Sequence, residues 1–122
     1  MTEITAEVAH LVRASRISRG IANIFPQHTS CSVVITENAD SSVRRDLEML
    51  AERWAPDGDP AYEHETEGDD DLAAHARSVL SGSSVTVPIA NEKLLLGTWQ
   101  GIYLWEHRTS PHMRRIVVTI IE

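Results

Sequence analysis

The chain has 122 residues, of which 42% are hydrophobic and 24% charged, and its formal net charge is −7. These values predict a single globular domain, 1–122, that buries a core of its own, and the negative charge argues against nucleic acid and anionic membrane surfaces as partners. No apolar run approaches the roughly 20 residues of a membrane span, the N-terminus lacks the features of a secretory signal, and Cys31 is the only cysteine, so we expect a cytoplasmic protein.

The first part of the chain alternates between helical and strand patterns. Residues 5–18 carry apolar side chains at helical spacing and Gly20 offers a stop, which predicts a helix. The segments 21–26 and 31–37 are short and rich in aliphatic residues, and we expect both to be strands.

The middle of the chain predicts two helices on either side of an acidic loop. Asp40 or Ser41 caps the first of them, and its apolar residues recur every three or four positions until Pro56 ends it. Residues 55–71 are polar, acidic and rich in Gly and Pro, so we expect a loop whose length favours a functional role. A third helix is predicted over about 70–80.

The C-terminal part of the chain predicts strands. Residues 84–89 alternate between apolar and polar, 94–106 form a long apolar segment, and 114–121 close the chain. Asn91 and Glu92 are expected to form a turn. Helices separated by pairs of strands, with strands gathered at the end, predict an α+β domain with about three helices and mostly antiparallel strands.

The sequence holds six histidines, and four of them stand where they could take part in chemistry: His28, His64, His75 and His107. Their spacing matches no local metal-binding motif. Taken singly, each also fits a structural role. His75 lies near the apolar side of its helix and could bond one backbone carbonyl, His28 stands where a strand begins, and His64 lies in the acidic loop. The residues alone therefore leave a histidine metal site and ordinary structural histidines as alternatives.

Acidic side chains accompany these histidines along the chain. Glu37, Glu65 and the run 69–71 could serve as metal ligands or as hydrogen-bond partners of ligands. An acidic run before a helix more commonly caps the helix and interacts with its dipole. We expect at least one of the three aspartates to do only that.

The segment LLLGTWQGIYLWEH, 94–107, places polar residues in a strand that should be buried. Gln100 and Glu106 both have even numbers, so regular alternation puts them on one face of the strand. Buried polar groups need partners. Either the two residues face a cleft and meet a ligand, or Gln100 bonds to backbone and Glu106 pairs with one of three arginines, Arg108, Arg114 and Arg115.

Three blocks of the sequence follow one another in a recognisable order: HTSCSVVITENAD, YEHETEGDDDLAAHARSVLSGSSVTVPI and LLLGTWQGIYLWEHR. Together they resemble the YjbQ family (UPF0047) of small bacterial and archaeal proteins. The resemblance extends from Ile4 to the C-terminus, and the GTWQGIYL block is specific. The family has been named for a secondary thiamine-phosphate synthase activity.

The resemblance implies an α+β fold built around a β-sandwich, assembly as a homotrimer, and a cluster of histidines and acids near the subunit interface. It implies zinc or a similar divalent metal bound by His28, His64 and His75. His107 is a reserve ligand. The catalytic residues that it suggests are Glu37, Gln100 and Glu106. Substrate contacts are expected from Asn38, Ser83, Ser84, Trp99 and Arg108.

The resemblance also implies a reaction. Thiamine-phosphate synthesis joins a pyrimidine diphosphate to a thiazole phosphate and expels pyrophosphate, so a divalent cation and basic groups should neutralise the departing charge. We therefore expect a metal-dependent enzyme with weak or secondary activity of this kind on a small phosphorylated substrate. The alternatives are a metal-dependent hydrolase of a small substrate and a non-catalytic trimer that binds a ligand or a metal.

Two features depart from the family pattern. Members carry further residues before the segment that matches TEIT, so we expect the family's N-terminal strand region to be absent. Either the start is genuinely short, or a sheet edge is uncovered and needs a partner or protection. Cys31 stands where relatives have a small residue such as Ala. This argues against a nucleophilic role for Cys31 and favours a small buried side chain.

Overall fold

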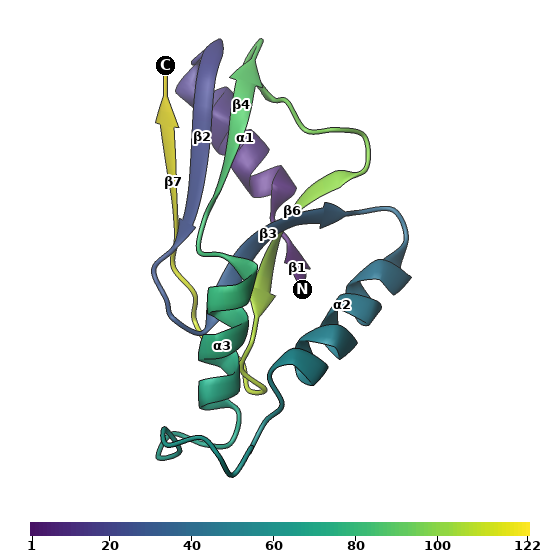
Figure 1. Ribbon diagram of the computed structural model, residues 1–122. Helices are drawn as coiled ribbons and strands as arrows, with labels where there is room; N and C mark the ends of the chain where they lie inside the picture. Colours follow the sequence, from purple (N-terminus) through teal and green to yellow (C-terminus); the bar gives the residue numbers. More distant parts are fainter.

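The protein is built from two antiparallel β-sheets and three α-helices (Figure 1). This computed structural model describes all of residues 1–122. The three-stranded sheet has the order β1–β6–β3, the four-stranded sheet has the order β5–β4–β2–β7, and every ladder is antiparallel. The strands are β1 (Thr2–Glu3), β2 (Arg19–Pro26), β3 (Cys31–Glu37), β4 (Val85–Ala90), β5 (Lys93–Leu94), β6 (Gln100–Glu106) and β7 (Ile116–Ile121). The helices are α1 (Thr5–Ser15), α2 (Ser41–Trp54) and α3 (Asp71–Ser81).

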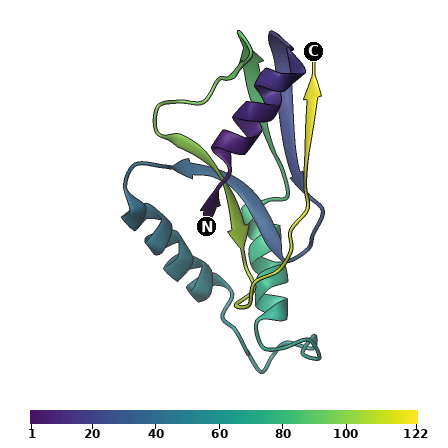
Figure 2. The same cartoon turned by 180° about the vertical axis from the view of Figure 1, so that it is seen from behind.

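The hydrophobic core lies where the two sheets and helix α1 meet. Val12 of α1, Ile24 of β2 and Ile102 of β6 are fully shielded from solvent and belong to one buried cluster. The two opposite views show α1 and the crossing strands β3 and β6 next to the long strands of the four-stranded sheet (Figure 1, Figure 2). The predicted α+β fold around a β-sandwich is therefore confirmed.

The other face of the four-stranded sheet is not covered within the chain. Four large apolar side chains on this face are 38–54% exposed, two of them on β2 and two on β7. The register of the two strands pairs Ile21 with Ile121 and Phe25 with Val117, so all four point to the same side. The single chain thus carries a sizeable exposed apolar surface.

Two predicted helix boundaries have different outcomes. α2 begins as expected, because the Asp40 carboxylate accepts a hydrogen bond from the Ser42 backbone N–H at 2.9 Å and caps the helix. The prediction that α1 extends to residue 18 is wrong. The helix ends earlier, because Arg16 adopts a left-handed backbone conformation (φ 59°) that closes the last turn. Gly20, the predicted stop, lies inside β2.

The prediction of one long strand over 94–106 is also wrong. β5 pairs with β4 in one sheet, whereas β6 starts only at Gln100 and pairs with β3 in the other sheet. A turn separates the two strands, in which the Gly97 N–H donates to the side-chain oxygen of Gln100 at 2.8 Å. Periodicity does not reveal such a crossing between sheets. The turn expected at Asn91 and Glu92 does form, with φ of 52° and 61°, and joins β4 to β5.

Helix α3 and the loop before it position the residues that carry chemistry. α3 begins at Asp71, within one residue of the predicted start, and the Ser78 hydroxyl donates to the Cys31 carbonyl of β3 at 2.8 Å. The acidic loop runs around one end of the molecule before it enters α3 (Figure 1). None of the three helices combines the length and the apolar character needed to cross a membrane.

Candidate metal centre

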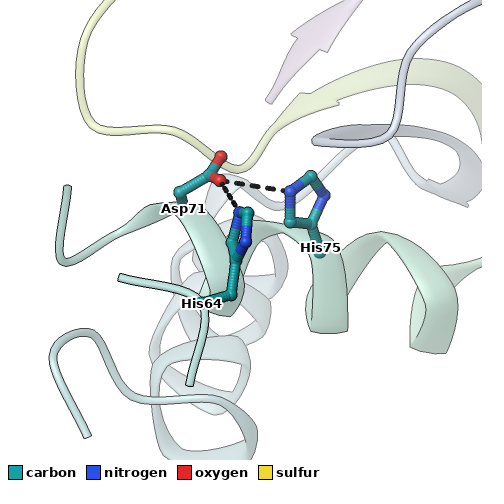
Figure 3. Close-up of side chains that lie close together, drawn as sticks. All are labelled: His64, Asp71 and His75. Atoms are coloured by element: carbon teal, nitrogen blue, oxygen red, sulfur yellow. Dashed lines mark hydrogen bonds and ion pairs between the residues drawn. The ribbon is translucent and has the colours of Figure 1, made fainter. Parts of the chain in front are cut away.

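Three side chains from the acidic loop and the start of α3 converge on one point (Figure 3). The Nε2 atom of His64 lies 2.6 Å, and the Nε2 atom of His75 lies 3.2 Å, from the same carboxylate oxygen, Oδ2 of Asp71. The centroids of the two imidazole rings are 5.4 Å apart. Three atoms that could each bind a metal ion therefore lie within 4.8 Å of one another.

Local structure explains this convergence. Asp71 and His75 are four residues apart on α3, so their side chains lie on the same side of the helix. Gly68, with a positive φ of 108°, turns the chain just before the helix. The side chain of Asp71 is 3% exposed, whereas those of His64 and His75 are 46% and 31% exposed. The cluster is therefore closed on the side of the acid and open to solvent on the side of the histidines.

Arg108, just beyond β6, holds the acidic residues in place. Its Nη1 donates to Oδ1 of Asp71 at 2.9 Å and its Nε donates to Oδ2 of Asp70 at 2.9 Å. Its Nη2 donates to the carbonyl of Glu67 at 3.0 Å. One oxygen of Asp71 is thus occupied by Arg108, and the other is free to face the two imidazoles.

These contacts determine the ionisation of the two aspartates. Hydrogen bonds from Arg108 and from the Thr109 backbone hold the pKa of Asp70 well below its usual range. Burial opposes the charged form of Asp71, but the hydrogen bond from His64 and the charges nearby outweigh it and lower the pKa. Asp70 occupies the N-cap position of α3 without a side-chain capping bond. Both aspartates therefore serve the cluster in their charged form.

The ring of His75 is oriented by the backbone. Its Nδ1 lies 2.9 Å from the carbonyl oxygen of Thr29. A carbonyl only accepts hydrogen bonds, so Nδ1 must carry a hydrogen, and in the neutral ring the Nε2 atom presents a lone pair toward Asp71. The expected structural role, a bond to one backbone carbonyl, is thus filled by one ring nitrogen while the other stays in the cluster.

His28 lies outside this cluster. Its Nε2 accepts a hydrogen bond from the Arg115 backbone N–H at 2.6 Å. Desolvation, together with the charge of Arg114, lowers the pKa of His28. His28 and His75 nevertheless line one open groove of about 460 Å³, together with Thr29, Ser78, Val79, Gly82 and Ser83. Of the two serines expected at the substrate, Ser83 therefore lines the groove, whereas Ser84 is exposed and is not part of its lining.

The polar residues of the β6 segment find partners within the chain. The Nε and Nη2 groups of Arg114 both donate to the carboxylate of Glu106, and this pairing lowers the pKa of Glu106 although burial opposes it. The Gln100 side chain accepts from the Gly97 N–H. These contacts correspond to the structural alternative for both residues. Their predicted catalytic role stays a prediction.

A second group of predicted residues gathers at the opposite end of the β3–β6 ladder. Glu37 pairs with Gln100 at this end, the Asn38 side chain donates to the Gln100 carbonyl at 3.4 Å, and Trp99 is 63% exposed. A ladder of this length spans roughly 20 Å. Within one chain, these residues are therefore far from Glu106, which pairs with the other end of β3.

His107, the reserve ligand, is buried away from the cluster. It is 3% exposed, its Nε2 lies 2.9 Å from the Ser32 hydroxyl, and its ring lies 4.8 Å from that of Trp105. Desolvation and the charge of Arg77 lower the pKa of His107 to about 4. The ring is thus a neutral, hydrogen-bonded core residue.

The structure joins two of the predicted metal ligands and leaves His28 and His107 outside. The third member of the cluster, Asp71, belongs to a run of three aspartates. From the sequence, each of them could be either a metal ligand or a helix cap. The signal that distinguishes it from its neighbours is the four-residue spacing to His75 on a helix. The contact of Arg108 with Asp71 has no local signal, because it joins residues 37 positions apart.

Comparisons with known proteins agree with this fold. The family model for the UPF0047 protein YjbQ-like family matches residues 1–122. A UPF0047 protein of Synechocystis sp. is 43% identical over 115 residues, which cover 94% of this chain and 78% of that protein. The UPF0047 protein YjbQ of Escherichia coli O157:H7 is 39% identical over 118 residues, which cover 96% and 85%.

A solved structure is similar as well. The crystal structure of a YjbQ/UPF0047 family protein from Clostridium acetobutylicum, described as an uncharacterized conserved protein, superimposes with a TM-score of 0.87 at 39% identity. The match covers 98% of this chain and 88% of that one. The whole-chain family match and these identities lead to one conclusion: the chain belongs to the YjbQ (UPF0047) family.

Proposed function

We propose that this protein is a metal-dependent enzyme that acts on a small phosphorylated substrate, with a divalent cation bound by His64, Asp71 and His75. The observation that carries the proposal is the convergence of two imidazole Nε2 atoms on one oxygen of a buried carboxylate. This set differs from the ligands expected from the family resemblance, since Asp71 takes the place of His28.

Hydrogen-bond direction supports a cation at this point. When the single hydrogen of the His75 ring is on Nδ1, the Nε2 lone pair and an oxygen of ionised Asp71 face each other at 3.2 Å. Two such groups repel unless a positive centre joins them, which is either a second proton on the ring or a metal ion. A second proton on the ring would join only His75 and Asp71. One metal ion would bind all three ligand atoms, Nε2 of His64, Nε2 of His75 and Oδ2 of Asp71.

The chemistry of the donors suits zinc. Imidazole nitrogen and carboxylate oxygen are typical zinc ligands, and three protein ligands with an open fourth position are typical of catalytic sites. The contacts that Thr29 makes to His75 and Arg108 makes to Asp71 correspond to the outer hydrogen bonds that orient metal ligands. A cation bound here would supply Lewis-acid charge to polarise a phosphoryl or carbonyl oxygen.

Family membership favours thiamine-phosphate synthase activity, weak or secondary, as the first reaction to test. The joining of a pyrimidine diphosphate to a thiazole phosphate releases pyrophosphate, and a cation next to an open groove would stabilise that departing charge. The exposed histidine side of the cluster also favours a second candidate, hydrolysis of a small substrate, because water can reach the open position.

We also propose assembly as a homotrimer, as the resemblance implies. The exposed apolar face of β2 and β7 supports this, because an apolar surface of this kind commonly marks a contact with another protein. An assembly would also allow the Glu37–Gln100 end of one copy to approach the histidine groove of another. Light scattering on the purified protein tests the state: a mass near three chains supports it, and a monomer contradicts it.

The enzymatic proposal is tested by product release. Zinc-loaded protein is given the pyrimidine diphosphate with and without the thiazole phosphate, and pyrophosphate is measured. Release that requires the thiazole phosphate and is lost in Asp71→Asn supports the synthase, with Asp46→Asn on the exposed side of α2 as the matched control. Phosphate release without the thiazole phosphate supports the hydrolase. Metal binding without either product would contradict both and favour a binding protein.

A further inference from the structure

A pocket with basic lining residues adjoins the groove that His75 lines. Its volume is about 330 Å³, and it is lined by Gln27, His28, Met113, Arg114 and Arg115. His28 also lines the groove that contains His75. The pocket and the groove therefore meet at His28, and the groove continues to His75 of the metal centre.

Only one of the three arginines in this region is available to a ligand. Arg108 is bound to Asp70 and Asp71, and Arg114 is bound to Glu106. The guanidinium of Arg115 enters no ion pair or hydrogen bond within the chain. The bonds of this residue are backbone ones, from its N–H to Nε2 of His28 and from the Gln27 N–H to its carbonyl. In a chain with a net charge of −7, this leaves a local positive site without an internal counter-charge.

His28 has a defined donor in the same pocket. Its Nε2 is occupied by the Arg115 backbone N–H, so the hydrogen of the neutral ring must sit on Nδ1, which is a donor without a partner in the chain. Desolvation and the charge of Arg114 lower the pKa of His28, and the charge of Arg115 acts in the same direction while that of Glu106 opposes it. The charges that disfavour a protonated ring also favour a bound anion.

We infer that this pocket is a phosphate-binding subsite, in which Arg115 and the Nδ1–H of His28 hold a phosphate group of the substrate while its reacting part lies toward His75. A phosphate is favoured over a carboxylate because three side chains that carry donors, those of Gln27, His28 and Arg115, line the pocket, and a tetrahedral phosphate offers three acceptor oxygens. The inference rests on the proposed function only for the position of the reacting part.

Pyrophosphate binding to chelator-treated protein tests the subsite without the metal. We measure its affinity by titration calorimetry for the wild type and for Arg115→Gln, which removes the charge at an exposed position. The matched control is Arg19→Gln, because Arg19 is also an exposed arginine, but it lies at the start of β2, whereas Arg115 lies just before the end of β7 that pairs with the last residue of β2. We expect Arg115→Gln to weaken binding about tenfold and Arg19→Gln to leave it unchanged. His28→Phe, which keeps a ring but no nitrogen, should weaken binding severalfold.

Several results would overturn the inference. These are no measurable pyrophosphate binding, equal losses in Arg115→Gln and Arg19→Gln, and tighter binding of malonate than of pyrophosphate. Binding that appears only with zinc and ignores Arg115→Gln would also overturn it, while leaving the proposed metal function intact. Conversely, Arg115-dependent binding in a protein that takes up no metal would support the subsite and contradict the proposed function.

Discussion

The guanidinium of Arg108 holds Oδ1 of Asp71 at 2.9 Å, and the other carboxylate oxygen of Asp71 faces the imidazoles of His64 and His75. This arrangement keeps a nearly buried carboxylate charged and pointed in one direction. Because all the guanidinium nitrogens already bind acidic residues or backbone, we propose that Arg108 acts as a positioning residue for Asp71 in place of the substrate contact expected from the sequence.

Replacing Arg108 should weaken metal binding without removing a ligand. Arg108→Gln leaves Asp71 without its partner, and loss of such an outer contact typically lowers metal affinity about 10- to 100-fold. Arg108→Lys keeps the charge but not the fork of donors, so its metal affinity should lie between those of the wild type and of Arg108→Gln. Competition with a chromophoric chelator measures the zinc affinity, with Arg13→Gln on the exposed side of α1 as control. Wild-type affinity in Arg108→Gln would refute the positioning role.

The two histidines of the groove should differ in their effect on the metal. His75→Ala removes a ligand and should abolish zinc binding while the assembly state is unchanged. His28→Phe should retain zinc, because Nε2 of His28 is bound to the Arg115 backbone N–H. Elemental analysis after gel filtration measures the zinc per chain and shows which of the two histidines binds the metal. Loss of zinc in both His28→Phe and His75→Ala would restore the ligand set expected from the family resemblance, and retention of zinc in His75→Ala would contradict both ligand sets.

His107 should make the folded state sensitive to moderate acid. Its pKa is about 4 in the folded chain against 6.5 for the ordinary side chain, so below pH 6.5 the unfolded chain binds a proton that the folded chain does not. The free energy of unfolding therefore falls as the pH drops from 6.5 toward 4, by at most roughly 3 kcal/mol. Urea unfolding at several pH values measures this. His107→Gln should flatten the dependence in this window, whereas His10→Gln, at an exposed position, should not.

Gly20 of β2 should be required for the close approach of the edge strand β7. A Cβ atom added at Gly20 would collide with the backbone carbonyl of Ile121 on β7, and backbone cannot move aside as a flexible side chain can. We expect Gly20→Ala to lower the free energy of unfolding by more than about 1 kcal/mol. Gly82→Ala tests the opposite case of open space, since no atom lies within 4 Å of the added Cβ, although its positive φ adds local strain. Unchanged stability in Gly20→Ala would show that the sheet edge tolerates displacement.

The elements that sequence patterns predicted well are those with local signals. The strand 31–37 and the cap at Asp40 agree with the structure, because aliphatic content and helix capping are properties of neighbouring residues. The end of α1 was predicted too late, since a left-handed Arg16 gives no compositional signal. The segment 94–106 was predicted as one strand because its apolar residues serve two sheets in turn.

The candidate site was only partly predictable for a similar reason. The spacing of Asp71 and His75 on one helix is visible in the sequence, but the approach of His64 depends on the path of a loop. The hydrogen bond of His75 to Thr29 and the ion pair of Arg108 with Asp71 join positions 46 and 37 residues apart. Tertiary structure alone brings such pairs together.

Zinc titration of chelator-treated, untagged protein tests the central claim most directly. We compare the wild type with Asp71→Asn, which keeps the shape of the side chain and removes its charge, and with Asp46→Asn as the exposed control. The account predicts about one zinc ion per chain in the wild type and in the control, and an affinity at least about tenfold lower in Asp71→Asn. A wild type that takes up no zinc or similar divalent metal, or an Asp71→Asn variant that binds it as tightly, would contradict the metal centre.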